Sequence, residues 1–219
     1  MTAPTMDEPP KPALRGRLHQ VAFFFWVPAG VALVALGRTP AARAASAVYA
    51  VSVMALYGVS ALYHRFPWSP RSRQWMRRVD HSTIFVFIAG TYTPLSVLAL
   101  QGAWRVSILA AVWGCAAVGV ALKITRLRAA SPAGTAMYVA LGWTAIIAMP
   151  QLVRDLTATE ITLLFLGGAL YTAGAIVYAL RRPDPNPRVF GFHELYHSLV
   201  IGGSICHYAM ILRLSLAGS

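Results

Sequence analysis

The sequence predicts an all-α membrane protein, a bundle of seven transmembrane helices with its N-terminus in the cytoplasm and its C-terminus outside. Of the 219 residues, 57% are hydrophobic and only 12% are charged, whereas a soluble domain carries about 25% charged residues. Apolar residues form seven long runs, and each run reaches the roughly 20 residues that a transmembrane helix needs. Basic residues concentrate in alternate segments between these runs, as in proteins that cross the membrane repeatedly.

Residues 1–17 precede the first apolar run and hold four prolines among mixed charges. Such a composition does not bury a core, so we expect a disordered cytoplasmic tail. Residues 18–219 are predicted to form one seven-transmembrane domain in the cell membrane. Its expected spans are 18–37, 44–64, 80–100, 104–123, 134–152, 159–180 and 191–214.

The distribution of charge orients the predicted bundle. Fourteen of the 19 Lys and Arg residues lie in the tail or after the second, fourth and sixth spans. These are Lys11, Arg15, Arg17, Arg65, Arg71, Arg73, Arg77, Arg78, Lys123, Arg126, Arg128, Arg181, Arg182 and Arg188. The other five are Arg38, Arg43, Arg105, Arg154 and Arg213. Because cytoplasmic loops carry the excess of basic residues, the larger group is placed on the cytoplasmic side.

The net charge of +12 also bears on partners. In a soluble protein such an excess would suggest nucleic acid. Here the basic residues lie between apolar runs, so we expect no nucleic-acid partner. We expect instead that the basic cytoplasmic segments contact anionic lipid headgroups.

Ionisable residues near the ends of three spans suggest a site, because such residues are costly in a membrane. His64 ends the second span, and Ser60 lies one turn deeper on the same helix face. Asp80 opens the third span. His193 and His197 open the seventh, and their i, i+4 spacing places both rings on one face, which suits two ligands of one metal.

The predicted topology brings these residues to a common depth at the cytoplasmic side. Three neutral imidazoles and a water are a known arrangement of catalytic zinc. The sequence therefore predicts Zn²⁺ held by His64, His193 and His197. Asp80 is predicted to orient the water, accept its proton or hold a ligating ring, and Ser60 to bond the water or a substrate carbonyl. The alternatives are a packing pair of histidines and an Asp80 that complements a helix dipole.

Four other ionisable residues are given lesser roles. His19 starts the first span and is expected at the membrane interface. His81 lies about 100° around the helix from Asp80, so it is structural or a helper of Asp80. Glu194 completes an HExxH string like that of zinc metalloproteases, but we assign it no catalysis. His207 lies about 15 Å deeper than His197 along a continuous helix and is expected to be a satisfied interior polar residue.

Several runs of residues resemble the hemolysin III family. They are Ser60 to His64, Arg78 to Ile84, Ala89 to Pro94 and Phe190 to His197. This family is the bacterial branch of the progestin and adipoQ receptor superfamily, which includes the adiponectin receptors and is related to alkaline ceramidases. The resemblance covers nearly the whole chain beyond the tail.

The resemblance implies seven helices with a cytoplasmic N-terminus. It also implies zinc held by His64, His193 and His197, an Asp80 that bonds the zinc-bound water, and a serine at position 60. The choice of zinc over iron or manganese depends on the three imidazoles and on this resemblance.

The function predicted from these features is a zinc-dependent, ceramidase-like hydrolase of lipid amide or ester bonds, with a role in membrane lipid homeostasis. One alternative is a receptor or membrane-state sensor, in which a structural zinc joins the second and seventh spans. Another is a pore-forming haemolysin, which would need a polar stripe along several spans. The sequence does not predict the substrate, the oligomeric state or the physiological role.

Overall fold

The computed structural model describes residues 12–125 and 132–217. These residues are almost entirely helical. The helices are α1 (Arg17–Leu36), α2 (Pro40–Arg65), α3 (Pro70–Ala99), α4 (Gly102–Thr125), α5 (Pro132–Gly142), the short 3₁₀ helix η1 (Trp143–Ile146), α6 (Met149–Asp155), α7 (Ala158–Leu180) and α8 (Phe192–Ala217).

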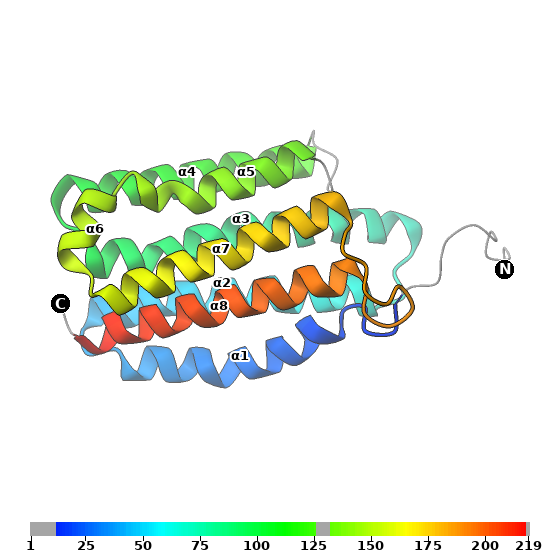
Figure 1. The fold of residues 1–219 in the computed structure, drawn as a ribbon, viewed down its shortest axis with the longest axis horizontal. Coiled ribbons are helices and arrows are strands. Elements are labelled where there is room, and N and C mark those ends of the chain that lie inside the picture. The colour runs from blue at the N-terminus through cyan, green and yellow to red at the C-terminus, as the bar shows by residue number, and fades with distance from the viewer. Residues whose placement is uncertain (1–11, 126–131, 218–219) are drawn as a thin grey trace, which may run out of the picture.

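Six of these helices, α1, α2, α3, α4, α7 and α8, are long and apolar enough to cross a membrane. Residues Ala133–Ile146 and Met149–Asp155 form a pair of apolar helical segments bent by 54°, and this pair makes a seventh span when it is counted as one. The prediction of a multi-span helical membrane bundle is therefore confirmed. The helices run side by side along the long axis (Figure 1), and α1 begins and α8 ends at opposite ends of the bundle.

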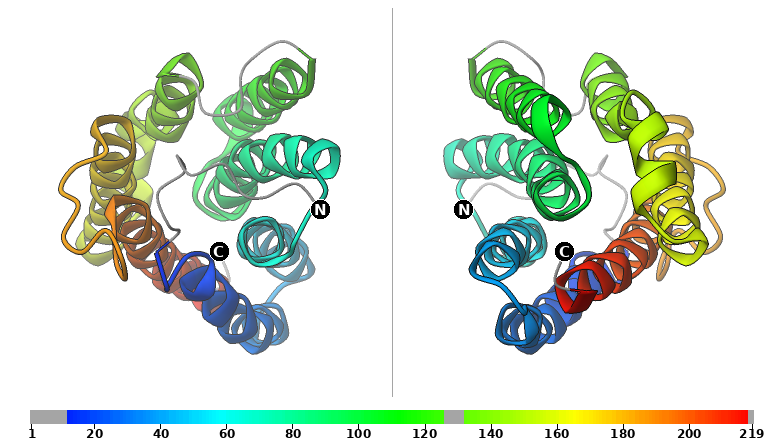
Figure 2. Two further views of the ribbon diagram at one scale, coloured as in Figure 1. Left: turned by 90° about the vertical axis from the view of Figure 1, so that its right-hand side faces the viewer. Right: turned by 90° about the vertical axis from the view of Figure 1, so that its left-hand side faces the viewer.

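Viewed along the bundle, the helices form a ring (Figure 2). Helices that follow one another in the chain pack together from α1 to α4, and α7 packs against α8. The last helix, α8, also contacts α1, α2 and α3. This arrangement brings the end of α2 next to the start of α8, although these segments lie far apart in the sequence.

The predicted fifth span, 134–152, is broken rather than continuous. Pro150 lies in the first turn of α6 and supplies no backbone N–H, which favours a new helix start at this point. The side chain of Tyr92 on α3 bonds to backbone groups beside the break. Its hydroxyl donates to the Gly142 carbonyl at 2.6 Å and accepts from the Ala145 N–H at 2.7 Å.

The third predicted span also starts earlier than expected, at Pro70. The side chain of Ser69 caps this helix by accepting a hydrogen bond from the N–H of Ser72 at 3.3 Å, and Pro70 suits the first helical position. Asp80 consequently lies well inside a helix of 30 residues. The reading of Asp80 as a charge at a helix N-terminus is therefore wrong.

The predicted cytoplasmic basic residues that the structure describes lie toward the right-hand end of Figure 1, where α1 begins. The five assigned to the other side lie at the opposite end. Lys11, Arg126 and Arg128 fall outside the described residues. Which end faces the cytoplasm stays a prediction from the charge distribution.

Helices α2 and α3 approach each other closely at Gly90. A Cβ atom added at Gly90 of α3 would lie 2.2 Å from the Ser52 Oγ atom of α2. Ser52 cannot easily move, because it is buried and its hydroxyl donates to the Tyr49 carbonyl at 2.8 Å. Small residues allow such helix contacts in membranes, where packing drives association.

The Gly90→Ala variant is therefore expected to be destabilised by about 1–3 kcal/mol through overpacking. The matched control is Gly114→Ala on α4, where an added Cβ would meet nothing within 4 Å. That control is expected to unfold at or above the wild-type temperature, because alanine is the better helix former. Thermal unfolding of both variants in detergent provides the measurement, and equal stability of the two would contradict the packing argument.

Candidate metal centre

Three histidines meet at the end of the bundle where α1 and α8 begin. His64 comes from the last turn of α2, and His193 and His197 come from the first turns of α8. Each ring offers one nitrogen atom such that all three atoms lie within 4.8 Å of one another. The Nε2 atoms of His64 and His193 lie 3.2 Å apart.

Local interactions fix the helix ends that carry these rings. The α2 helix stops at Arg65, and the indole N–H of Trp68 donates to the Leu62 carbonyl at 3.0 Å in its last turn. At the start of α8, the N–H of Gly191 donates to Glu194 Oε2 at 3.0 Å. Both interactions hold backbone next to a candidate ligand.

The geometry of the cluster fits zinc. Two imidazole nitrogens on one tetrahedral zinc, each about 2.0–2.1 Å from the ion, lie about 3.3 Å apart. The Nε2 atoms of His64 and His193 are separated by 3.2 Å. The Nδ1 atom of His197 is buried and has no hydrogen-bond partner within the described part of the chain.

A cavity of about 150 Å³ adjoins the cluster. Ser60 and Asp80 line it together with His193 and His197. From there the lining continues between α3, α5, α7 and α8 as far as His207, and most of it is apolar or aromatic.

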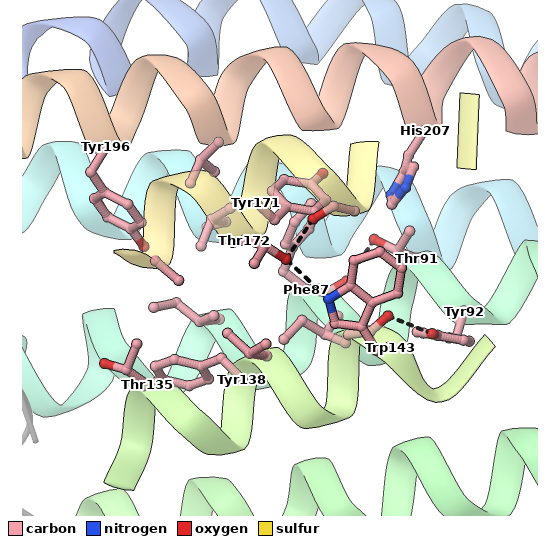
Figure 3. A pocket seen from close by; sticks show the side chains of 18 of the residues that line it. Phe87, Thr91, Tyr92, Thr135, Tyr138, Trp143, Tyr171, Thr172, Tyr196 and His207 are labelled. Carbon is pink, nitrogen blue, oxygen red and sulfur yellow. Dashed lines mark hydrogen bonds between the residues drawn. The ribbon is translucent and has the colours of Figure 1, made fainter. Parts of the chain in front are cut away.

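Figure 3 shows the aromatic side chains along this cavity, among them Phe87, Tyr138 and Tyr171. A hydrogen bond from the indole N–H of Trp143 to Thr172 Oγ1, at 3.0 Å, joins η1 to α7 in the wall of the cavity. The cavity therefore joins a polar end at the histidines to a long apolar interior.

The ring of His81 lies next to the Asp80 carboxylate. Its Nδ1 atom is 3.5 Å from Asp80 Oδ2 and 3.0 Å from the Arg77 carbonyl. Its Nε2 atom lies 3.4 Å from the Tyr178 hydroxyl. The two side chains are largely buried, at 11% exposure for His81 and 12% for Asp80. His81 is thus held between α3 and α7 and can steady the Asp80 carboxylate.

His19, expected at the membrane interface, lies in the first turn of α1 and is buried within the bundle. His19 is only 3% exposed, and its ring stacks on that of His197 with 3.5 Å between the centroids. The sequence contained a signal that pointed to this position. The first span starts on the predicted cytoplasmic side, so His19 lies at the depth of the histidines that open the seventh span.

Glu194 is fully buried and forms an ion pair with Arg15. Its carboxylate also accepts a hydrogen bond from the Gly191 N–H and so stabilises the start of α8. Both interactions fit a structural role for Glu194. His207 bonds to the Leu164 carbonyl through Nε2 at 3.2 Å, while its Nδ1 has no partner among the described residues. His207 was expected to have hydrogen-bond partners inside the bundle, and one of its two ring nitrogens has one.

Comparison with known proteins places this site in a family. The profile of the family described as Haemolysin-III related matches residues 8–208, a range that contains the whole histidine cluster. The chain belongs to the haemolysin III-related family.

Named relatives agree with this membership. This haemolysin III-related chain is 33% identical to Hemolysin-3 of Bacillus cereus over 197 residues, which cover 89% of this chain and 87% of that protein. It is 34% identical to the Hemolysin-3 homolog of Bacillus subtilis (strain 168) over 165 residues, covering 75% and 74% of the two chains. It is also similar to the Heptahelical transmembrane protein ADIPOR1 of rice, at 28% identity over 156 residues, covering 64% of this chain and 42% of the rice protein.

Proposed function

We propose that this integral membrane protein is a zinc-dependent hydrolase that cleaves amide or ester bonds of membrane lipids at its cytoplasmic end. The proposal depends on one observation, the convergence of three imidazoles from two helices at the polar end of a mostly apolar cavity. Ser60 and Asp80 line the same cavity, so the groups needed for hydrolysis share one site.

The fit of the donor set favours zinc, which His64, His193 and His197 would hold. When bound, zinc would supply a Lewis acid for a carbonyl group and acidify a water molecule. The remaining chemistry belongs to side chains of this protein. Asp80 would accept a proton from the attacking water and return it to the leaving amine or alcohol.

Ser60 and His81 would assist the reaction in different ways. The Ser60 hydroxyl would donate a hydrogen bond to the carbonyl oxygen, where negative charge develops. His81, 3.5 Å from Asp80 Oδ2, would orient the carboxylate. The overall reaction is a hydrolysis, in which a C–O bond to water forms and the C–N or C–O bond of the lipid breaks.

The class of substrate follows from the surroundings of the site. The cavity continues from the histidines between α3, α5, α7 and α8, lined mainly by apolar and aromatic side chains. Such a lining excludes a charged or sugar-like substrate and suits an acyl chain. A membrane lipid fits both parts of the cavity when its carbonyl lies beside Ser60 and its acyl chain enters the apolar interior. Turnover of such a lipid would serve membrane lipid homeostasis.

The direct test uses the purified protein in lipid nanodiscs with its zinc content measured. It is incubated with long-chain N-acyl amides and with acyl esters, and released fatty acid is quantified by mass spectrometry. We expect release that stops when a chelator removes zinc and returns when zinc is restored. A protein that carries stoichiometric zinc but releases fatty acid from neither class would argue decisively against the proposal.

A further inference from the structure

The segment before α1 packs against the helix ends that carry the histidines. We call residues 12–16 the strap. Its backbone is bonded to the loop that leads into α8, with the N–H of Ala13 donating to the Arg188 carbonyl at 2.9 Å and the N–H of Leu14 donating to the Val189 carbonyl at 3.2 Å. The strap thus follows a defined path and differs from the disordered tail expected for residues 1–17, of which residues 1–11 lie outside the described range.

Two further contacts fix the strap directly over the candidate ligands. Arg15 pairs with the buried Glu194, the residue next to His193. Gly16 has a φ of +77°, and a Cβ added there would lie 2.6 Å from His64 Cβ. This conformation favours glycine, and the space permits nothing larger. The start of α1 is therefore attached to both helices that carry the histidines.

Three residues after the strap, His19 lies against His197. The two rings are stacked, with 3.5 Å between centroids and 13° between planes. His19 also meets Tyr57 edge-on, at a centroid distance of 4.9 Å. In the described part of the chain neither ring nitrogen of His19 has a hydrogen-bond partner. The contact that His19 makes with the centre is accordingly through the face of its ring.

A stacking contact can hold the His197 ring in one orientation. A histidine binds a metal only when its ring is turned so that a nitrogen points at the ion, and rotation about the bond to the ring is soft. Metal-binding histidines are usually held by a hydrogen bond to their second nitrogen. The Nδ1 atom of His197 has no such partner among the described residues. A ring stacked on its face can take over this restraint.

We propose that His19 is a positioning residue of the metal centre, which fixes the orientation of His197 by stacking on it. The inference rests on the proposed zinc binding and adds a fourth histidine to the site without making it a ligand. His19 is not a member of the group of nitrogen atoms that lie within 4.8 Å of one another.

The test compares three variants with the wild type. His19→Ala removes the stacked ring, His19→Phe keeps an aromatic face without ring nitrogens, and Phe23→Ala is the matched control. Phe23 lies one turn further along α1 and packs against Gly58 of α2, away from the centre. Zinc affinity is measured by competition with a chelator, and the visible spectrum of the cobalt-substituted protein reports the geometry of the ligands.

We expect His19→Ala to bind zinc about 10- to 100-fold more weakly and to alter the cobalt spectrum, as loss of an outer partner of a ligand does. His19→Phe is expected to restore affinity and spectrum to nearly wild-type values. Phe23→Ala should lower thermal stability while leaving both readouts unchanged. A variant that loses zinc affinity only because it unfolds would have a lower melting temperature in the absence of zinc. Phe23→Ala shows how far the melting temperature can fall without a change in zinc affinity.

Two results would overturn the inference. Unchanged zinc affinity in His19→Ala would show that the stack does not orient His197. Equal losses in His19→Ala and His19→Phe would show that the ring nitrogens matter and the stacked face does not. The proposed function fails separately, when the wild-type protein binds zinc but hydrolyses no lipid. A wild type that binds no zinc would overturn both.

Discussion

The His64→Ala variant is expected to lose its zinc, and His193→Ala is expected to do the same. Each change removes one of three donors whose nitrogen atoms lie within 4.8 Å of one another. Since loss of an outer partner alone costs about 10- to 100-fold in metal affinity, loss of a ligand should cost more than about 100-fold. Elemental analysis of protein purified without added zinc should give about one zinc per wild-type chain and almost none in either variant.

The control for this experiment is His207→Ala on α8. It removes a buried histidine of the same helix, whose ring bonds to the Leu164 carbonyl at 3.2 Å and lies outside the cluster. This variant should keep its zinc even if its stability falls. If all three variants held the metal equally well, the cluster would not be the binding site, and a purely packing role for the two histidines of α8 would become the better account.

The Asp80→Asn variant is expected to keep its zinc and lose its hydrolytic activity. The amide has the shape of the carboxylate but cannot accept the proton of the attacking water. Removal of a general acid–base group lowers rates by about 10²- to 10⁴-fold. Fatty-acid release per zinc-loaded chain in nanodiscs measures the effect, with zinc content determined on the same sample.

The same substitution separates catalysis from a structural role of the metal. A zinc that only joins α2 to α8 in a receptor would leave function intact in Asp80→Asn. The control is Asp155→Asn at the end of α6, an identical chemical change at an exposed site at the opposite end of the bundle. Equal activity of the two variants would rule out Asp80 as the proton acceptor and favour the structural metal.

Much of the fold could be predicted because the membrane simplifies the rules. A span must be long and apolar, and its backbone must satisfy itself, so hydropathy alone located the helices. The interruption near Pro150 was harder to foresee. Prolines are tolerated in membrane helices where neighbours bond to the freed groups, and here the neighbour is the Tyr92 hydroxyl of another helix. No local pattern reveals such a contact.

The early start of α3 had a different cause. The first turns of this helix are polar and lie outside the apolar run, so hydropathy placed the boundary at Asp80. The helix is set at Pro70 by the capping hydroxyl of Ser69, a signal of helix formation and not of membrane insertion. The two kinds of boundary differ by ten residues in this segment.

The candidate site was predictable to the extent that topology fixes depth. Helix ends on one side of the membrane share a level, which grouped His64 with His193 and His197. Depth does not say which helices are neighbours, and only the ring arrangement supplies that information. His19 was missed for the same reason, because its role depends on contact between α1 and α8, which no spacing in the sequence indicates.

The separation of the ligands along the chain has a consequence for biogenesis. His64 and His193 are 129 positions apart, so ribosomal synthesis releases α2 into the bilayer long before α8 exists. Chains fold from the N-terminus as they are made, and an incomplete polypeptide would present a single imidazole with no companion. If the cluster binds zinc as proposed, acquisition of the ion awaits the final helix, and metal content becomes a reporter of completed insertion.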